Sequence, residues 1–444
     1  MKKTFVTLTT LFLLVFFLAF REKATSILFS GKNNEKMAVA KAAIIKPESV
    51  TPKNLTSLEN YFTRLGDNGS PMDFQSVLVE TLDGKTLVEC NADVALNPAS
   101  VMKLAVCYLA LKRFEPDHKF KTLAYTTGLV DESKQTLYGD IVIETEGDPN
   151  FTVADAASFG ASIRSQGIKK VEGSLIIKGP MLLRHSSNPE FVYSKLKSTI
   201  GIHFSKSVAA LEVVDRSKDE GKVLLAVHYS QPLKELLLSM NAFSDNYYAE
   251  HFGLMLGGIA AVETELETEF NLKPQQLEIT HASGLDYNRI TTRASIKIFQ
   301  KMIGLLKSYQ MKVEDIMPIV GVDSGTLATR LNGTPLLGAV VAKTGTLHVT
   351  DDGASILQGV IYTKQYGPVM FAIFNMVGKV NYFRQEQDQL LTELVPELGL
   401  TPMPVRFTNI FPDQSPVLVD VKDFPEKKVY GKHGKGSRGK KHRR

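Results

Sequence analysis

The sequence predicts an α/β fold in which an antiparallel sheet is covered by helices. Two stretches of alternating polar and apolar residues carry this prediction, at 74–90 and 354–377, with helical patterns lying between and after them. Such an order brings strands from both ends of a domain into one sheet. With 444 residues, 43% of them apolar and 22% charged, the chain is globular and long enough for two or three domains.

Residues 1–23 are expected to be a signal sequence or a membrane anchor. Two lysines precede 17 uncharged, mostly apolar residues, a length between that of a signal core and that of a spanning helix. A small-residue cleavage motif at 38–40 comes late, which favours an uncleaved anchor. Residues 24–55 are polar and lysine-rich and are expected to form a linker. The remainder is then predicted to be exported, either periplasmic or on the outer face of the cytoplasmic membrane.

The remaining elements follow from periodicity and turn signals. Asp83-Gly84 between two alternating strands is a strong hairpin signal. In chain order, the further predictions are a helix at 100–114, short strands up to 148, a capped helix and a strand within 148–179, helices near 233–257 and 292–308, a strand at 339–345, a hairpin at 354–377 and a last helix near 381–398.

The charge is concentrated at the C-terminus. Residues 426–444 hold nine Lys/Arg and one Glu; removing them from the 52 basic and 47 acidic residues leaves 43 and 46. This glycine-rich tail is predicted to be disordered. On an exported protein its expected partner is an anionic membrane or wall polymer, or it is a solvated tail without a role, and no nucleic acid is expected.

Two cysteines occur, Cys90 and Cys107, and two interpretations of them stay open. In an exported chain they could form a disulfide, because Cys90 ends a predicted strand just before the helix that holds Cys107. Alternatively, both are small buried hydrophobic residues.

Ser100 and Lys103 are the first candidates for chemistry. Ser-x-x-Lys occurs three times, at Ser100, Ser194 and Ser437, but only Ser100 opens a strongly apolar helix. At a helix start this spacing places both side chains on one face, so that Lys103 Nζ can reach Ser100 Oγ. Burial would lower the pKa of the lysine and allow it to act as a base. The plain alternative for Ser100 is a helix N-cap.

Two further motifs follow in order, Ser244-Asp245-Asn246 and Lys343-Thr344-Gly345-Thr346. Each alone would be ordinary, as a turn and as a strand end. Together with the Ser100 motif they form the ordered set Ser-x-x-Lys, Ser-Asp-Asn and Lys-Thr-Gly that marks penicillin-binding proteins and serine β-lactamases.

On these motifs the chain resembles the class C, low-molecular-mass penicillin-binding proteins, the D-alanyl-D-alanine carboxypeptidase/endopeptidase family. The supporting stretches lie between residues 74 and 400 in the family's order: NADVALNPASVMKL, EGDPNFTVAD, SDNYYAE, HASGLDYNRITTRA, VGVDSGTLATRL and VVAKTGTL. The resemblance implies a β-lactamase/transpeptidase-like fold with an antiparallel sheet, flanking helices, a helical region and one small inserted domain. The expected boundaries are 56–121 and 233–405 for the discontinuous transpeptidase-like domain, 122–232 for the insert and 406–425 for a C-terminal extension.

The resemblance also implies an activity on peptidoglycan stem peptides, inhibition by β-lactam antibiotics, and no cofactor or metal. Ser100 would attack the carbonyl between two D-alanines, with Lys103 as its base. Ser244 would relay a proton to the leaving amine, and Asn246 would hold the substrate amide and the Lys103 amine.

The third motif would bind the substrate's end. Lys343 would supply positive charge, and Thr344, Gly345 and Thr346 would line the substrate, with the two hydroxyls on its terminal carboxylate. By the same resemblance, the backbone N–H groups of Ser100 and Thr346 would form the oxyanion hole.

Some features depart from the family. The insert is short and the chain contains no Trp, which leaves the peptide side-chain specificity open. Asp148 is expected to form a turn or helix cap, and His281, which stands where the family has an aspartate, to be a surface or packing residue. Asp351 and Asp352 are expected to alter the strand edge beside the substrate.

Two rival functions remain. A serine β-lactamase would need a glutamate that activates water; residues 267–271, ETEFN, loosely resemble that loop but are interpreted as an ordinary helix pattern. A non-catalytic wall-binding protein would not need the complete motif set. The sequence leaves carboxypeptidase and endopeptidase activity undistinguished.

Overall fold

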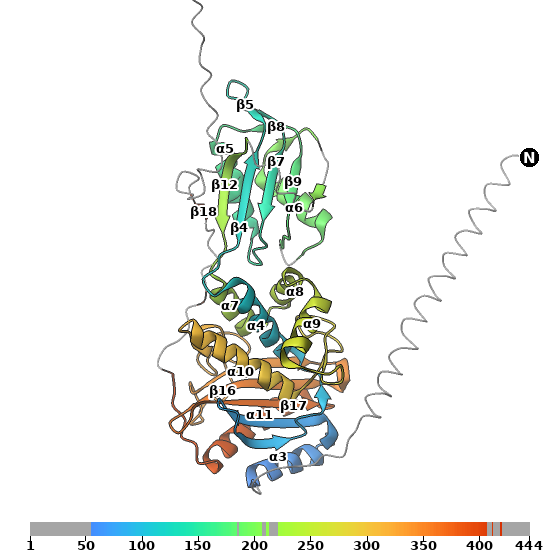
Figure 1. The fold of residues 1–444 in the computed structure, drawn as a ribbon, viewed down its shortest axis with the longest axis vertical. Helices are drawn as coiled ribbons and strands as arrows, with labels where there is room; N and C mark the ends of the chain where they lie inside the picture. The colour runs from blue at the N-terminus through green and yellow to red at the C-terminus, as the bar shows by residue number, and fades with distance from the viewer. Residues whose placement is uncertain are drawn as a thin grey trace, which may run out of the picture. The chain divides into compact units, whose positions relative to one another are not determined.

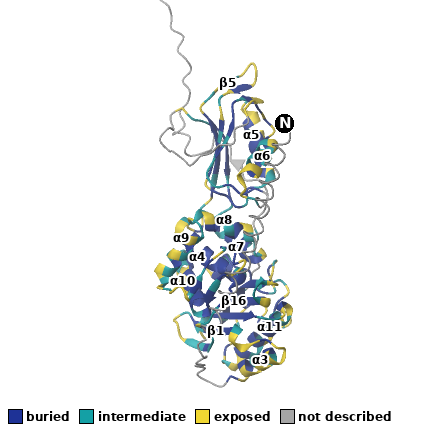
Figure 2. Cartoon of the chain, turned by 90° about the vertical axis from the view of Figure 1, so that its right-hand side faces the viewer, coloured by how far each residue is buried: buried dark blue, intermediate teal, exposed yellow. Residues whose placement is uncertain are grey.

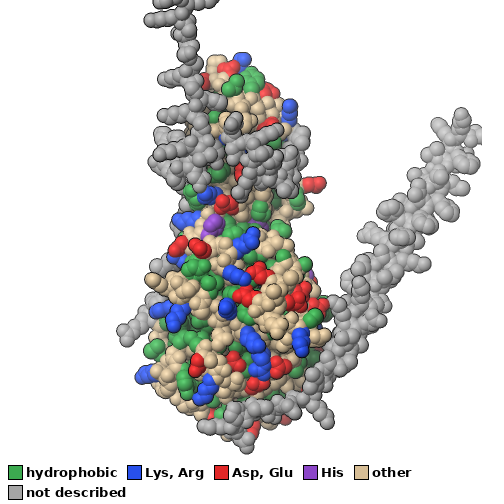
Figure 3. Space-filling model, viewed as in Figure 1, with side chains coloured by type: hydrophobic (Ala, Val, Ile, Leu, Met, Phe, Trp, Pro, Cys, Tyr) green, Lys and Arg blue, Asp and Glu red, His purple; other side chains and the backbone are tan. Residues whose placement is uncertain are grey.

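The computed structural model describes residues 55–183, 186–206, 210–212, 221–405, 411 and 418–419. The predicted signal or anchor, nearly all of the predicted linker and the basic tail lie outside these residues. Within them, no helix combines the length and the apolar character needed to cross a bilayer. On the face drawn in Figure 3, basic and acidic side chains of the described part are interspersed.

A five-stranded antiparallel sheet organises the fold, in the order β15-β16-β17-β1-β2. The N-terminal hairpin, β1 (Gln75–Thr81) and β2 (Thr86–Cys90), pairs with the C-terminal hairpin, β16 (Ala354–Thr363) and β17 (Gly367–Met376). β15 (Val340–Leu347) forms one edge of the sheet. The prediction that both ends of the domain meet in one antiparallel sheet is confirmed.

Helices cover both faces of this sheet (Figure 1). One face packs against α3 (Thr56–Asp67) and α11 (Val380–Glu397), and the other against α4 (Lys103–Phe114) and α10 (Thr292–Ser308). The strands between them are almost wholly buried, as the dark blue of Figure 2 shows. The sequence analysis did not foresee α3, which packs on α11 and begins directly after the buried Leu55.

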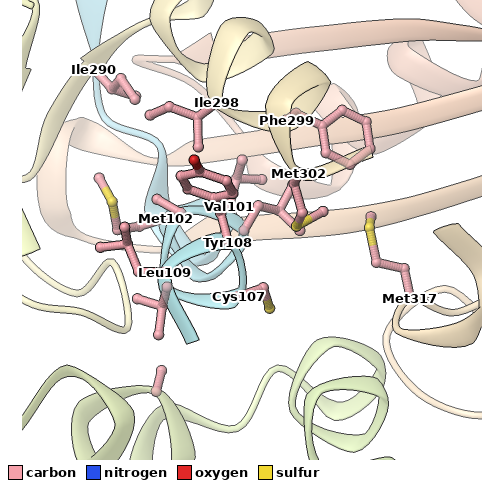
Figure 4. Close-up of a cluster of buried hydrophobic side chains, with 14 of the residues drawn as sticks. Val101, Met102, Cys107, Tyr108, Leu109, Ile290, Ile298, Phe299, Met302 and Met317 are labelled. Carbon is pink, nitrogen blue, oxygen red and sulfur yellow. The ribbon is translucent and has the colours of Figure 1, made fainter. Parts of the chain in front are cut away.

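The helix that follows the candidate serine is the centre of one core. Every residue from Lys103 to Leu111 is buried in α4, because the helix is enclosed on all sides by apolar neighbours. Figure 4 shows its Tyr108 and Leu109 among side chains from other elements, including Ile298 and Met302 of α10. Such enclosure holds the start of the helix, and the serine just before it, in a fixed place.

A helical region completes this half of the fold. The predicted helical stretch 233–257 is confirmed as two helices, α7 (Leu233–Phe243) and α8 (Asn246–Met255), separated at Ser244. α9 (Ile259–Phe270) follows. The small elements are a three-stranded sheet of β13 (Leu277–Glu278), β14 (Arg289–Thr291) and β3 (Ala95–Leu96), and the 3₁₀ turns η1 (Met72–Phe74), η2 (Ala99–Met102), η3 (Val313–Asp315) and η4 (Thr350–Asp352).

The chain between α4 and α7 forms two further sheets with their own apolar core. Its first sheet, in the order β10-β8-β6-β5, contains β5 (Leu129–Asp131), β6 (Thr136–Tyr138), β8 (Lys170–Glu172) and β10 (His203–Phe204). Its second, in the order β11-β9-β7-β4-β12-β18, contains β4 (Lys121–Thr126), β7 (Ile141–Thr145), β9 (Leu175–Lys178), β11 (Ala210–Glu212), β12 (Val223–Tyr229) and the C-terminal β18 (Leu418–Val419). α5 (Val153–Ser165) and α6 (Pro189–Ile200) complete this inserted part.

Candidate active site

Ser100 lies in the tight 3₁₀ turn η2, three residues before α4 begins at Lys103. Its neighbour Ala99 has a φ of 44°, a left-handed conformation that costs a residue with a Cβ. Two glycines permit the close packing of this turn. A Cβ on Gly284 would lie 1.8 Å from the Ala99 carbonyl oxygen, and one on Gly345 would lie 2.6 Å from that of Pro98. Neither position accepts a larger residue without moving the serine.

Lys103 is completely buried beneath this turn. Its Nζ donates to Ser100 Oγ at 2.9 Å, to Asn246 Oδ1 at 2.8 Å and to the carbonyl oxygen of Ser283 at 2.7 Å. Burial lowers the pKa of Lys103 to about 7, although the negative charges of Glu250 and Asp245 act in the opposite direction. At neutral pH a substantial fraction of the amine is therefore unprotonated and able to accept the serine's proton.

The break between α7 and α8 carries the second motif. Ser244 adopts the left-handed conformation with a φ of 57°, which ends α7. Asp245 then caps α8, because its Oδ1 accepts hydrogen bonds from the backbone N–H groups of Tyr247 and Tyr248. As a result, Ser244 faces Lys343 and Asn246 faces Lys103. The sharp turn lets two neighbouring residues serve two separate amines.

Lys343 is also completely buried. Its Nζ donates to Ser244 Oγ at 2.9 Å and to the Thr344 carbonyl oxygen at 2.8 Å. Burial, and next the positive charge of Lys103, hold the pKa of Lys343 well below its usual range. Its two acceptors match the two protons of a neutral amine, whereas Lys103 has three acceptors.

The third motif lies on the open edge of the sheet. Apart from a bridge between Ile319 and Val341, the described strands leave the outer edge of β15 without a partner. Side chains alternate along the strand, so Thr344 and Thr346 point away from the face that Lys343 occupies. The Thr344 hydroxyl shares a hydrogen bond of 2.9 Å with Thr326.

The structure thus joins the predicted side chains in two hydrogen-bonded groups, Ser100 with Lys103 and Asn246, and Ser244 with Lys343, which neighbour each other through the Ser244-Asp245-Asn246 turn. Residues 65–199 and 189–393 match the model of the D-Ala-D-Ala carboxypeptidase 3 (S13) family. The chain belongs to this family. Ser100, Lys103 and the Ser244 and Lys343 motifs all lie within the matched S13 segments.

Solved structures share the S13 fold. A predatory peptidoglycan endopeptidase from Bdellovibrio bacteriovorus is 20% identical, with a TM-score of 0.66 over 78% of this chain and 98% of that one. The same endopeptidase, acylated by penicillin G and in complex with an immunity protein, gives 22% identity and a TM-score of 0.61. Penicillin binding protein 4 from Haemophilus influenzae gives 19% identity and a TM-score of 0.60 over 76% and 99% of the two chains. At these identities the likeness establishes the fold.

A curated relative covers a shorter stretch. The D-alanyl-D-alanine carboxypeptidase DacB of Haemophilus influenzae is 23% identical over 110 residues, which are 25% of this chain and 22% of that protein. The match therefore spans about a fifth of the relative's length.

A support behind Lys103 in this S13 site was not predicted from the sequence. Glu250 lies one helical turn after Asn246 on α8, and its carboxylate accepts hydrogen bonds from the backbone N–H and the hydroxyl of Ser283. Ser283 in turn presents its carbonyl oxygen to Lys103. The spacing of four between Asn246 and Glu250 in the SDNYYAE stretch is the only sequence signal for this support.

The residues that depart from the family have other contacts. Asp148 forms the predicted turn, accepting from Asn150 N at 2.8 Å, and its buried carboxylate also lies 2.9 Å from His228 Nε2. His281 is at the surface, with 40% of its side chain exposed, and the described residues contain no cluster able to hold a metal ion. The predictions of a turn at Asp148 and of a surface position for His281 are confirmed.

Asp351 braces the nucleophile's turn from the other side. Its carboxylate accepts from Asn97 Nδ2 at 2.7 Å and pairs with Arg289 at 2.6 Å. Asn97 Oδ1 in turn accepts from Ala99 N at 3.0 Å. Asp351 therefore acts on the entry to the serine turn rather than on the strand edge alone.

The cysteines are free thiols, so the disulfide alternative is wrong. Cys107 is buried beside Asn241, and Cys90 is partly buried. Glu267 lies near the end of α9, as the interpretation of an ordinary helix requires.

Proposed function

We propose that the protein is a serine-type D-alanyl-D-alanine carboxypeptidase/endopeptidase that acts on peptidoglycan stem peptides through an acyl-enzyme on Ser100. The observation that carries this proposal is the contact of 2.9 Å between Ser100 Oγ and an enclosed Lys103 whose pKa is about 7. A lysine in this state can take a proton at neutral pH, which an exposed lysine rarely can.

Acylation then follows from the contacts. When Lys103 is neutral, the bond to Ser100 reverses, and the hydroxyl donates its proton to Nζ while Oγ attacks the carbonyl carbon of the penultimate D-alanine. Collapse of the tetrahedral intermediate breaks the amide bond and forms the ester. The leaving amine receives a proton from Ser244, and Ser244 regains the proton that Lys103 took from Ser100, so the step consumes no net proton. Asn246 keeps Lys103 in place throughout.

The open edge of β15 supplies a place for the substrate. An extended peptide can pair with the outward backbone groups of β15 near Thr346, as peptides do at other exposed sheet edges; the Thr344 carbonyl is already held by Lys343. This arrangement would lay the scissile carbonyl near Ser100, because η2 packs directly against β15. Backbone N–H groups of Ser100 and Thr346 would then stabilise the oxyanion, at roughly 3 kcal/mol of barrier for one donor.

The same chemistry supports acylation by β-lactams, whose strained amide opens to an ester on the serine. The penicillin-acylated state of the Bdellovibrio endopeptidase, a protein of the same fold, supports this expectation. Export by residues 1–23 and binding of an anionic polymer by the basic tail belong to the same proposal. Export and tail binding would both place the enzyme next to peptidoglycan, its proposed substrate.

The complete set of hydrogen-bonded motif residues favours this function over a non-catalytic receptor. A serine β-lactamase additionally needs a carboxylate that activates water for fast deacylation. Among the described residues, Glu250 is the carboxylate whose charge acts most on Lys103, and it is occupied by hydrogen bonds from Ser283. Slow deacylation, and hence lasting labelling by penicillin, is the expected behaviour.

The decisive experiment combines labelled penicillin with mass spectrometry. We expect a stable covalent adduct on the peptide that contains Ser100, and a complete loss of labelling in Ser100→Ala with an unchanged Tm. Ser194→Ala, the same substitution in the other described Ser-x-x-Lys motif, serves as the control and should label normally. Rapid release of hydrolysed penicillin would instead identify a β-lactamase, and no adduct would contradict the proposal.

A second assay separates the two peptidase activities. The purified protein is incubated with linear and cross-linked muropeptides, and the products are identified by mass. Loss of one terminal D-alanine shows carboxypeptidase activity, and conversion of dimers to monomers shows endopeptidase activity.

A further inference from the structure

Arg384 on α11 contacts the third motif from the face of the sheet that lies opposite α4 and Lys343. Its Nη2 donates to Thr346 Oγ1 at 3.0 Å. Residues 344 and 346 point toward the layer that contains α11, which explains how a helix residue so late in the chain can contact this motif. Both Arg384 and Thr346 are only partly buried, so solvent and small ligands can approach them.

The guanidinium of Arg384 has no carboxylate partner among the described residues, whereas Arg64 and Arg330 each pair with a carboxylate of α11. Asp388, one turn later on the same helix, is occupied by Arg330, and Glu386 is occupied by Arg64. Burial, and next the positive charge of Arg330, lower the pKa of Arg384. An arginine in such surroundings still keeps its charge at neutral pH, and it therefore favours the arrival of an anion.

The hydroxyl of Thr346 can donate a hydrogen bond to the same anion. Because its Oγ1 accepts a hydrogen bond from Arg384, its own hydroxyl proton remains available to a second acceptor. A carboxylate placed between them would receive one bond from the hydroxyl and a second from the guanidinium. Charge-assisted bonds of this kind are the strongest that a protein offers to a carboxylate.

Lys343 is poorly suited to be the permanent charge of this site. It is fully buried, both of its donor contacts are satisfied inside the protein, and burial holds its pKa well below the usual range. Arg384 is only partly buried, so its charge is the more accessible one to an incoming carboxylate.

We propose that Arg384 is a specificity-determining residue that binds the C-terminal carboxylate of the stem peptide, and the equivalent carboxylate of β-lactams, together with Thr346. This inference rests on the proposed function, since it names the residue that selects a free carboxyl terminus at that same site. It predicts a preference for substrates that end in a carboxylate over neutral analogues, and it assigns this preference to Arg384.

The test compares charged and neutral ligands in matched variants. Acylation rate constants are measured for a penicillin and for its methyl ester, with wild-type protein, Arg384→Gln, Arg384→Lys and Arg64→Gln. We expect Arg384→Gln to lower the rate with the free acid about 10- to 100-fold, the loss typical of one charged hydrogen-bond partner, and the rate with the ester less than about 3-fold. Arg384→Lys should recover part of the difference, and Arg64→Gln, which removes another arginine in contact with α11, should leave it unchanged.

A merely structural role for Arg384 would lower both rates equally, and that result would overturn the proposal. A separate binding experiment distinguishes failure of the Arg384 proposal from failure of the proposed function. In a Ser100→Ala background, calorimetry measures the affinity for a peptide that ends in D-Ala-D-Ala and for its C-terminal amide, with and without Arg384→Gln. If wild-type protein forms no adduct, the proposed function is rejected, while a carboxylate preference that depends on Arg384 still supports the binding site. Equal affinities for both peptides would reject the site as well.

Discussion

The two halves of the site place a buried lysine in contrasting surroundings. Lys103, between α4 and α8, has three acceptors and lies near the carboxylates of Glu250 and Asp245. Lys343, on β15, has two acceptors, and the charge that acts most on it is that of the other lysine. Both amines are enclosed, yet only the first is balanced by negative charge.

This difference assigns different tasks to the two amines. Partial compensation leaves Lys103 with a pKa of about 7, so it can both take and return a proton within one catalytic cycle. Lys343 lacks that compensation, so burial and the charge of Lys103 hold its pKa well below the usual range. When a substrate carboxylate arrives, it supplies the missing negative charge and raises the pKa of Lys343. Substrate binding is therefore expected to be coupled to proton uptake on the β15 side.

The largest expected effect is on the α4 side. Lys103→Ala removes the base and the hydrogen bond that orients Ser100, so acylation by penicillin should slow by about three orders of magnitude or more. Stopped-flow or gel-based labelling gives the rate constant. Lys112→Ala, a substitution of an exposed lysine on the same helix, is the control and should label at the wild-type rate. An unchanged rate in Lys103→Ala would assign the base to another group.

A smaller effect is expected from the carboxylate behind Lys103. The negative charge of Glu250 raises the pKa of Lys103, so Glu250→Gln should lower that pKa further below its ordinary value. The acylation rate of the wild type should rise with pH through about 7, as the amine loses its proton. In Glu250→Gln this rise should move about one pH unit to lower pH, because the base form appears earlier.

Glu263→Gln is the matched control for this pH profile. Its carboxylate also accepts from a backbone N–H, that of Ile279, at 2.8 Å, but it has no contact with Lys103. The profile of this variant should coincide with that of the wild type. A profile that moves in Glu263→Gln and not in Glu250→Gln would refute the proposed electrostatic support.

The Lys103 half of the site was largely predictable from the sequence, because one helical turn links its two main residues. The contact between Ser100 and Lys103 needs only the spacing of three and a buried helix. The break at Ser244 was indicated only by the turn-forming residues at 244–246, because the apolar pattern itself continues from α7 into α8.

Contacts between residues that are far apart in the sequence could not be predicted from motif spacing. The Ser283 carbonyl belongs to the backbone and leaves no trace in the side-chain pattern. Arg384 contacts Thr346 because α11 packs across the face of the sheet, a result of tertiary packing between elements 38 positions apart. In sequence it is one more charged residue of an amphipathic helix. The free state of Cys107 likewise depends on distances that only the fold sets.

The smallest expected effect concerns stability and lies on the β15 side. Lys343→Met should raise the Tm by roughly 2–6 °C at neutral pH, because a buried amine without an anionic partner destabilises the fold. The loss of stability is linked to proton binding. Because the pKa of Lys343 is depressed in the folded state, the unfolded chain binds more protons than the folded protein as pH falls below about 10.5, and the free energy of unfolding decreases.

The pH dependence of this gain distinguishes electrostatics from better packing. As pH falls from 10 toward 6, unfolding of the wild type becomes progressively easier relative to Lys343→Met, so the gain in Tm should grow. Lys297→Met, which replaces an exposed lysine on α10, should show no such trend. A gain that is constant across pH would mean that methionine merely packs better. Lys343 would then not be an uncompensated amine, and the contrast between the two halves of the site would disappear.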